Sequence, residues 1–168
     1  MKVFGITGWK NAGKTGLMER LVTDITARGL SVSTIKHAHH SFDVDQPGRD
    51  SFRHRAAGAQ EVLLASAHRV ALMQELRGAP EPSLDQLLAR MSPVDLILIE
   101  GYKRSPHPKV EAVRAINNHP LLAKDDSTIR AIACDDAPDL DKTAFNGAVF
   151  NLNDTAAIAG FILSEVGL

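Results

Sequence analysis

Apolar residues along the chain alternate between short continuous runs and runs with helical spacing, a pattern typical of folds that mix strands and helices. Residues 2–7 form an apolar run before a glycine-rich turn, which indicates a buried strand. Apolar residues then recur at helical spacing until Gly29, the expected helix stop. These apolar positions are Leu17, Leu21, Val22 and Ile25. With a second strand at residues 30–36, the pattern predicts one right-handed βαβ unit.

The rest of the chain continues with both kinds of pattern. The strongest strand covers residues 94–99, whose apolar run is continuous from Leu96, as expected when helices cover both faces of a sheet. Ser83 and Gln86 form a capping-box pattern that opens a helix carrying apolar residues as far as Met91. The remaining expected elements are a short helix at 51–59, short apolar runs at 61–65 and 69–73, strands at 110–113, 129–133 and 148–152, and a helix at 154–166.

Together these elements predict an α/β fold in three layers, built as a single domain over residues 1–168 around a mostly parallel sheet. The apolar runs near residues 61–73 predict an antiparallel hairpin that extends this architecture. The sequence leaves open whether the hairpin belongs to the core or forms an interface.

Composition limits the class of protein. With 168 residues, 44% hydrophobic and 23% charged, the chain can bury a core. A net charge of −1 gives no indication of general nucleic-acid or membrane binding. The one cysteine, Cys134, excludes an intrachain disulfide and a zinc site of several thiolates. Because no apolar run approaches the roughly 20 residues that span a bilayer, and the first strand leaves no room for a signal peptide, we expect a cytoplasmic protein.

A phosphate-binding motif follows the first strand. Residues 8–15 read Gly-Trp-Lys-Asn-Ala-Gly-Lys-Thr and match G-x-x-x-x-G-K-[ST] at every fixed position, between a strand and a helix as the motif requires. The glycines let the backbone curl so that N–H groups point at phosphate oxygens, and the helix start adds its dipole. Lys14 is predicted to reach the β- and γ-phosphates in a catalytic role, and Thr15 to ligate Mg²⁺. The predicted nucleotide contacts here are Gly8, Asn11, Ala12, Gly13, Lys14, Thr15 and Gly16. The motif indicates a P-loop NTPase fold.

A carboxylate stands at the end of the strongest strand. Because the C-terminal ends of parallel strands meet beside the phosphate loop, Glu100 and Gly101 are expected close to the nucleotide. Glu100 is predicted to act in catalysis, near the metal ion or positioning a water; the alternative is a carboxylate that caps the turn at Gly101. Asp95 lies five residues earlier, roughly 16 Å away at about 3.3 Å per residue, and is expected at the opposite edge.

The second strand leads into a loop rich in histidines and acids. Residues 36–40 read Lys-His-Ala-His-His, and we expect Lys36 and His37 to contact phosphate or a second substrate. Partner contacts or solvated positions are the alternatives. A zinc site is disfavoured, because three histidines in four residues alternate in direction and no cysteine lies near. Behind them, Asp45 is a candidate metal ligand, and Asp50 either approaches the metal or caps the following helix.

These segments resemble the molybdopterin-guanine dinucleotide biosynthesis protein B family, the small P-loop partner in attaching GMP to molybdopterin. Four stretches carry the resemblance: residues 8–15, 35–51, 95–103 and 131–135. The second is the most particular, with Lys-His-x-His-His followed by Asp-x-Asp-x-Pro-Gly-x-Asp-Ser. The chain departs from the family pattern at residues 10–12, where Lys-Asn-Ala replaces a segment ending in Ser-Gly, and at Tyr102, where phenylalanine is frequent.

The resemblance implies a homodimer that binds GTP and Mg²⁺ and hydrolyses GTP slowly at most. It also implies an accessory role beside the molybdenum cofactor guanylyltransferase and molybdopterin-loading proteins.

The sequence gives little direct evidence on which nucleotide base is bound, because the usual guanine signature, Asn or Thr followed by Lys-x-Asp, is absent. Asp135 is the candidate acceptor for the N1–H and N2–H₂ donors of guanine, with helix or turn capping as the alternative. A small-molecule or nucleotide kinase with the same loop is the alternative function. A regulatory GTPase fits less well, since the guanine signature is missing.

Overall fold

The computed structural model describes residues 1–38, 42–135 and 145–168 of the chain. The chain divides into two compact units. We call Met1–His37 together with Met91–Leu168 the sheet unit, and Ala38–Arg90 the hairpin unit. The expectation of a single nucleotide-binding domain over residues 1–168 stays a prediction.

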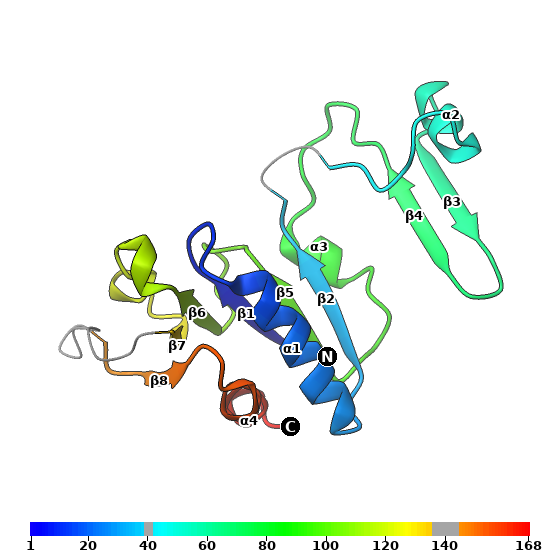
Figure 1. Cartoon of the computed structure of the whole chain (residues 1–168). Coiled ribbons are helices and arrows are strands. Elements are labelled where there is room, and N and C mark those ends of the chain that lie inside the picture. Colours follow the sequence, from blue (N-terminus) through cyan, green and yellow to red (C-terminus); the bar gives the residue numbers. More distant parts are fainter. Residues whose placement is uncertain (39–41, 136–144) are drawn as a thin grey trace. The chain divides into compact units, whose positions relative to one another are not determined.

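The sheet unit is built on a six-stranded sheet with the order β2-β5-β1-β6-β7-β8 (Figure 1). All neighbouring strands pair in parallel, which confirms the predicted α/β class and the mostly parallel sheet. Glu100 and Cys134 extend two of the strands one residue beyond the predicted apolar runs, because their backbones continue the ladder. The strands are β1 (Lys2–Thr7), β2 (Val32–Lys36), β5 (Leu96–Glu100), β6 (Lys109–Val113), β7 (Ile129–Cys134) and β8 (Ala148–Asn151).

Two helices, α1 (Lys14–Ala27) and α4 (Thr155–Val166), pack against each other on one face of the sheet. Leu17 and Leu21 of α1 are fully buried there with Phe4 of β1, as the helical spacing predicts. Each such side chain stabilises the fold by about 1.5–3 kcal/mol relative to exposure. In the described part of the chain no helix is long and apolar enough to cross a membrane.

Buried polar residues occupy the opposite face of the sheet, which the sequence does not reveal. Along β6, Lys109 and Glu111 alternate with apolar residues of the core and are 0% exposed. Lys109 Nζ donates to the carbonyl oxygen of Ser105 at 2.6 Å and lies 3.5 Å from an oxygen of Asp126. Burial lowers the pKa of Lys109, while the negative charge of Asp126 opposes this.

Glu111 is held by the segment that follows β6. This segment contains two short 3₁₀ helices, η1 (Ala115–Asn117) and η2 (Leu122–Lys124), neither of which the sequence predicts. The Glu111 carboxylate accepts hydrogen bonds from the N–H groups of Leu122 and Ala123, each at 2.9 Å. Burial raises the pKa of Glu111, and these two hydrogen bonds oppose the rise.

The hairpin unit contains α2 (Asp50–Ala56), β3 (Glu61–Ala65), β4 (Val70–Gln74) and α3 (Leu84–Leu88). Strands β3 and β4 form the predicted antiparallel hairpin, with Leu63 opposite Leu72, as a sheet of their own. Ser83 and Gln86 form the predicted capping box at the start of α3. This helix ends at Leu88, three residues short of the expected Met91.

Candidate functional site

The phosphate loop joins β1 to α1 through a backbone that favours glycine at two positions. Gly8 has a φ of 135°, and a Cβ there would lie 2.4 Å from the carbonyl oxygen of Ala112 in neighbouring β6. Gly13 has a φ of 89° and stands at the N-cap of α1. Asn11 also has a positive φ, 61°, which asparagine adopts more readily than most residues. The curled chain therefore ends in the N-terminus of a helix, whose first N–H groups are natural donors to an anion.

The side chain of Lys14 lies against the loop that precedes it. Its Nζ donates to the carbonyl oxygens of Gly8 at 3.1 Å and Trp9 at 2.6 Å. Burial lowers the pKa of Lys14; the negative charge of Glu100 opposes this, and two nearby lysines add to the lowering. An anion beside this ammonium would offset the burial and the like-charge repulsion together.

Glu100 ends β5 beside the loop, as its position in a parallel sheet predicts. Its Oε1 accepts a hydrogen bond from Thr15 Oγ1 at 3.3 Å and lies 3.5 Å from Lys36 Nζ at the end of β2. The Glu100 side chain is 12% exposed, so its charge interactions are stronger than at an open surface. Asp95 lies at the other end of β5, where its Oδ2 accepts hydrogen bonds from N and Oγ of Ser31 at 2.8 and 2.6 Å.

An open pocket of about 380 Å³ lies over the loop. Its lining residues are Asn11, Ala12, Gly13, Lys14, Thr15, Glu100 and Arg114. All but one of these are predicted from the sequence. Arg114 is the residue that sequence reasoning misses. It directly follows β6, and an arginine at that place in a parallel sheet is a signal only once β6 is known to lie beside β1.

Asp135 lies next to Arg114, one residue past the end of β7. Its Oδ2 accepts a hydrogen bond from Arg114 Nη1 at 3.3 Å, and its Oδ1 accepts one from the N–H of Ala115 at 2.9 Å. A further contact joins this region to the phosphate loop, because Asn117 Nδ2 donates to the carbonyl oxygen of Asn11 at 3.2 Å. The ends of β6 and β7 therefore form one wall of the site.

The indole of Trp9 stands at another edge of the loop. Its Nε1 donates to the carbonyl oxygen of Pro120 at 2.7 Å. The ammonium of Lys103 lies 4.4 Å from the centre of the Trp9 ring, and the centres of the Trp9 and His119 rings are 5.2 Å apart. An indole ring attracts a cation at this distance. Trp9 therefore connects the phosphate loop to the segment after β5, which contains Lys103.

The chain matches a family of known proteins over most of its length. The family model for molybdopterin guanine dinucleotide synthesis protein B, or MobB, matches residues 3–135. The chain belongs to this family. The matched residues include the phosphate loop, Glu100, Arg114 and Asp135, so the whole of the pocket described above lies within the MobB region.

Individual relatives agree with this assignment. A protein of Haemophilus influenzae is 38% identical over 163 residues, which are 95% of this chain and 86% of that protein. A protein of Escherichia coli K12 is 37% identical over 164 residues, 96% of this chain and 91% of that protein. Both are named molybdopterin-guanine dinucleotide biosynthesis adapter protein.

Solved MobB structures have the same fold. The crystal structure of Bacillus subtilis MobB matches with a TM-score of 0.71 and 26% identity, covering 99% of this chain and 98% of that one. The MobB homologue of Bacillus stearothermophilus matches with a TM-score of 0.68 and 27% identity, covering 99% of both chains. The family resemblance of the motifs and the predicted fold class are confirmed.

His37 lies at the Glu100 side of the site. Its N–H donates to the carbonyl oxygen of Glu100 at 2.9 Å, and its ring lies 4.7 Å from the ring of Tyr102. Gly101, with a φ of 97°, allows this approach, because a Cβ there would lie 3.0 Å from His37 Cβ. His39 and His40, also part of the histidine-rich stretch, lie outside the described residues.

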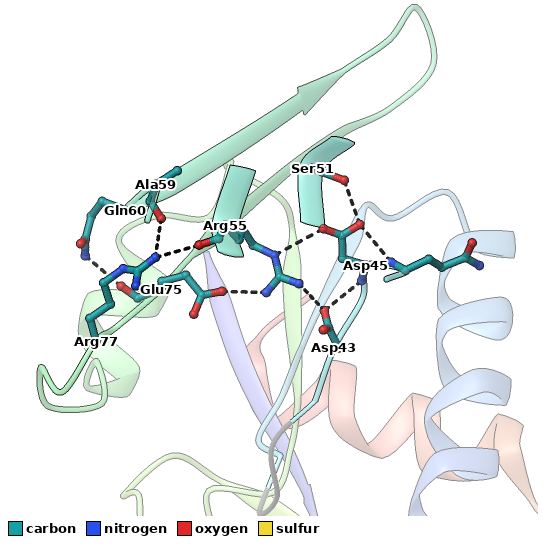
Figure 2. A network of polar contacts seen from close by, with 9 residues as sticks. Asp43, Asp45, Ser51, Arg55, Ala59, Gln60, Glu75 and Arg77 are labelled. Atoms are coloured by element: carbon teal, nitrogen blue, oxygen red, sulfur yellow. Dashed lines mark hydrogen bonds and ion pairs between the residues drawn. The ribbon is translucent and has the colours of Figure 1, made fainter. Parts of the chain in front are cut away.

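The acid-rich stretch after the histidines takes part in a network of polar contacts in the hairpin unit (Figure 2). The guanidinium of Arg55 lies between three carboxylates, at 2.7 Å from Glu75, 2.8 Å from Asp43 and 3.3 Å from Asp45. Asp45 also accepts a hydrogen bond from Ser51 Oγ at 2.8 Å, and its side chain is 6% exposed. Hydrogen bonds to Glu75 and Asp43 raise the pKa of Arg55, so its charge is permanent. The role of Asp45 as a metal ligand stays a prediction.

Within residues 1–38, 42–135 and 145–168, no three histidine, cysteine, aspartate or glutamate side chains are grouped to hold a metal ion. The oxygens that the structure brings together at the phosphate loop are those of Thr15 and Glu100.

Proposed function

We propose that this protein binds GTP with Mg²⁺ at the phosphate loop and serves as an accessory protein in the attachment of GMP to molybdopterin. One observation carries the proposal: a phosphate loop with Lys14 against it and a Thr15–Glu100 pair beside it, in a member of the MobB family. The name of the relatives, adapter proteins of molybdopterin-guanine dinucleotide biosynthesis, supports the pathway and the guanine nucleotide.

Thr15 and Glu100 fit the requirements of Mg²⁺. The ion prefers oxygen ligands at about 2.0–2.1 Å in octahedral geometry and is usually held by one or two protein groups plus phosphates and waters. Thr15 Oγ1 and Glu100 Oε1 are 3.3 Å apart, so a small cation can contact both, directly or through a water. Bound there, Mg²⁺ would neutralise charge on the β- and γ-phosphates.

Lys14 supplies the second source of positive charge. On nucleotide binding, we expect its ammonium to exchange the carbonyl oxygens of Gly8 and Trp9 for phosphate oxygens, which form stronger, charge-assisted hydrogen bonds. We expect slow hydrolysis by the isolated protein, because among the described residues no glutamine lines the phosphate pocket to orient a water.

A binding titration with purified protein tests the nucleotide site. We expect GTP with Mg²⁺ to bind the wild type, and Lys14→Ala to weaken binding about tenfold to a hundredfold, the range for losing hydrogen bonds to a charged group. Lys10→Ala is the matched control, since this exposed lysine of the same loop should be dispensable. Equal binding of ATP, with accumulation of a phosphorylated small molecule, would instead support a kinase.

We also propose that the protein is a homodimer joined through the hairpin unit. One face of the β3–β4 hairpin exposes large apolar side chains, with Leu63, Val70 and Leu72 between 57% and 65% exposed. An isolated two-stranded hairpin is at best marginally stable in water, so burial against a second copy would stabilise this one. Sedimentation should give a dimer for the wild type and a monomer for Leu72→Glu. Ile116→Glu, at an 89% exposed position outside the hairpin, should remain dimeric.

The proposed protein partners are the molybdenum cofactor guanylyltransferase and molybdopterin-loading proteins, and the proposed location is the cytoplasm. A reconstituted guanylyltransferase reaction tests this role. Product yield should rise on addition of the wild type and should not rise on addition of Lys14→Ala. Equal stimulation by both proteins would separate the accessory role from nucleotide binding.

A further inference from the structure

Arg114 lies against the phosphate loop in the sheet unit. It is the first residue after β6 and lines the same pocket as Lys14 and Thr15. Its Nε and Nη2 atoms lie 3.3 and 3.5 Å from the point where a Cβ of Gly13 would be. Because Gly13 has no side chain, the guanidinium can approach the loop backbone at the start of α1. Its side chain is 46% exposed, so a ligand in the pocket can reach it.

Asp135 fixes the direction in which this guanidinium points. One carboxylate oxygen accepts from Arg114 Nη1 at 3.3 Å, and the other accepts from the N–H of Ala115 at 2.9 Å. The backbone contact anchors the carboxylate, and the carboxylate in turn anchors one end of the arginine. Among the described residues, no protein acceptor bonds to Nε or Nη2, which lie on the side of Gly13.

The charge of the pocket suits a phosphate group. Of the charged residues that line it, Lys14 and Glu100 cancel, and Arg114 adds a second positive charge. Lys36 and Lys103 also lie close enough to Lys14 to lower its pKa, so the surroundings of the pocket are positive as well. A guanidinium stays charged at every physiological pH and binds phosphate oxygens with two N–H groups at once.

We propose that Arg114 is a phosphate-binding residue of the nucleotide site and that Asp135 is its positioning residue rather than a reader of the guanine base. The inference rests on the proposed function, because it names a further contact within the same nucleotide site. It predicts that Asp135 affects nucleotides through their phosphates, whatever base they carry.

Base choice provides the test. Affinities for GTP, ITP and ATP, each with Mg²⁺, are measured by calorimetry for the wild type and for Arg114→Ala, Arg114→Lys and Asp135→Asn. ITP lacks the N2 amino group of guanine, so a residue that accepts from this group distinguishes GTP from ITP. We expect Arg114→Ala to weaken all three nucleotides about tenfold or more. Arg114→Lys should recover only part of this loss, because lysine lacks the planar fork.

Asp135→Asn should weaken GTP, ITP and ATP by the same factor, leaving the ratios of their affinities unchanged. Since Asp135 acts through Arg114, the substitution should have little further effect in the Arg114→Ala background. A loss of affinity in Asp135→Asn that is largest for GTP, smaller for ITP, which keeps the N1–H donor, and absent for ATP overturns the inference and assigns Asp135 to the base. Additive losses in the double variant also overturn it.

Arg130→Ala is the matched control. Arg130 is a similarly exposed arginine paired with a carboxylate, Glu165, at 3.2 Å, but it does not line the phosphate pocket. Its substitution should leave all three affinities unchanged. Melting temperatures of every variant show whether a loss of binding reflects unfolding. If the wild type binds no nucleotide, the proposed function fails; if the wild type binds and Arg114→Ala binds equally well, this inference alone fails.

Discussion

Gly8 provides a quantitative test of the loop geometry. In Gly8→Ala, the alanine must adopt a backbone φ of 135°, and its methyl group meets the carbonyl oxygen of Ala112 at 2.4 Å. Gly29→Ala is the matched comparison, because Gly29 has a φ of 86° and no atom within 4 Å of the position of its Cβ. Both substitutions strain the backbone, but only the first also drives a side chain into a neighbouring strand.

The two costs can be estimated separately. Forcing a non-glycine residue into a sparsely populated backbone region costs about 1–3 kcal/mol, and this applies to both variants. Since Cβ contacts below 3.0 Å are essentially never observed, Gly8→Ala must also move the loop or β6 until this contact of 2.4 Å has lengthened to at least 3.0 Å. Such overpacking typically costs a further 1–3 kcal/mol or so. We therefore expect Gly8→Ala to destabilise the protein by about 2–6 kcal/mol and Gly29→Ala by about 1–3 kcal/mol.

Denaturant unfolding of both variants measures this difference, followed by GTP titration at a temperature where both are folded. For a chain of this size, about 2–4 °C of melting temperature corresponds to each kcal/mol. Gly8→Ala should also bind nucleotide weakly, because a shifted Gly8 misplaces the curled amides, whereas Gly29→Ala should bind normally. Equal stability and equal GTP affinity of the two variants would refute the view that the close packing of Gly8 against β6 shapes the site.

Three further predictions concern single side chains. Burial, and secondarily the charge of Lys109, lowers the pKa of His107 to about 4 from 6.5, so the unfolded state binds its proton first as pH falls. Stability should therefore fall between about pH 6.5 and 4, by about 1–2 kcal/mol after allowance for partial exposure, and His107→Gln should flatten this dependence in denaturant titrations. Asp126→Ala should destabilise the protein more than Lys109→Met, because it leaves the buried ammonium of Lys109 without its carboxylate partner. We expect Asp126→Ala to lower the free energy of unfolding by about 2–4 kcal/mol, measured by the same denaturant titration. Trp9 is the one tryptophan of the chain and follows Gly8 in the phosphate loop, so GTP should change the intrinsic fluorescence of the wild type. Lys14→Ala should need about tenfold to a hundredfold more GTP for the same change.

The elements of the fold follow closely from local patterns. Residues 2–7 and 96–99 are predicted as strands because continuous apolar runs are typical of buried parallel strands, and all of Leu96–Glu100 is buried. The helix after the phosphate loop follows from apolar residues at helical spacing, and α3 starts where its capping box stands. These signals are local, so a single sequence contains them.

What the sequence does not contain is the set of contacts between distant segments. Lys109 and Glu111 are charged residues of β6, yet both are buried, because Asp126 and the N–H groups of residues 122–123 satisfy their hydrogen bonds and charges. No local sequence pattern predicts these partners of Lys109 and Glu111, which lie 11–17 residues further along the chain. Arg114 is missed for the same reason, since its relation to Gly13 depends on which strands are neighbours.

Strand order explains why the site has its particular pairs of charges. In space the strands run β2, β5, β1, β6, β7, and the groups at their C-terminal ends are, in the same order, Lys36, Glu100, the phosphate loop, Arg114 and Asp135. Lys36 and Glu100 are register partners in adjacent strands, and Arg114 and Asp135 directly follow the register partners Val113 and Cys134. Each cation therefore has a carboxylate on the neighbouring strand, and the phosphate loop lies between the two pairs. Glu100 and Arg114 hold the inner positions, because β5 and β6 are the two neighbours of β1. The proposed metal-binding carboxylate and the proposed phosphate-binding guanidinium therefore flank the loop from opposite sides.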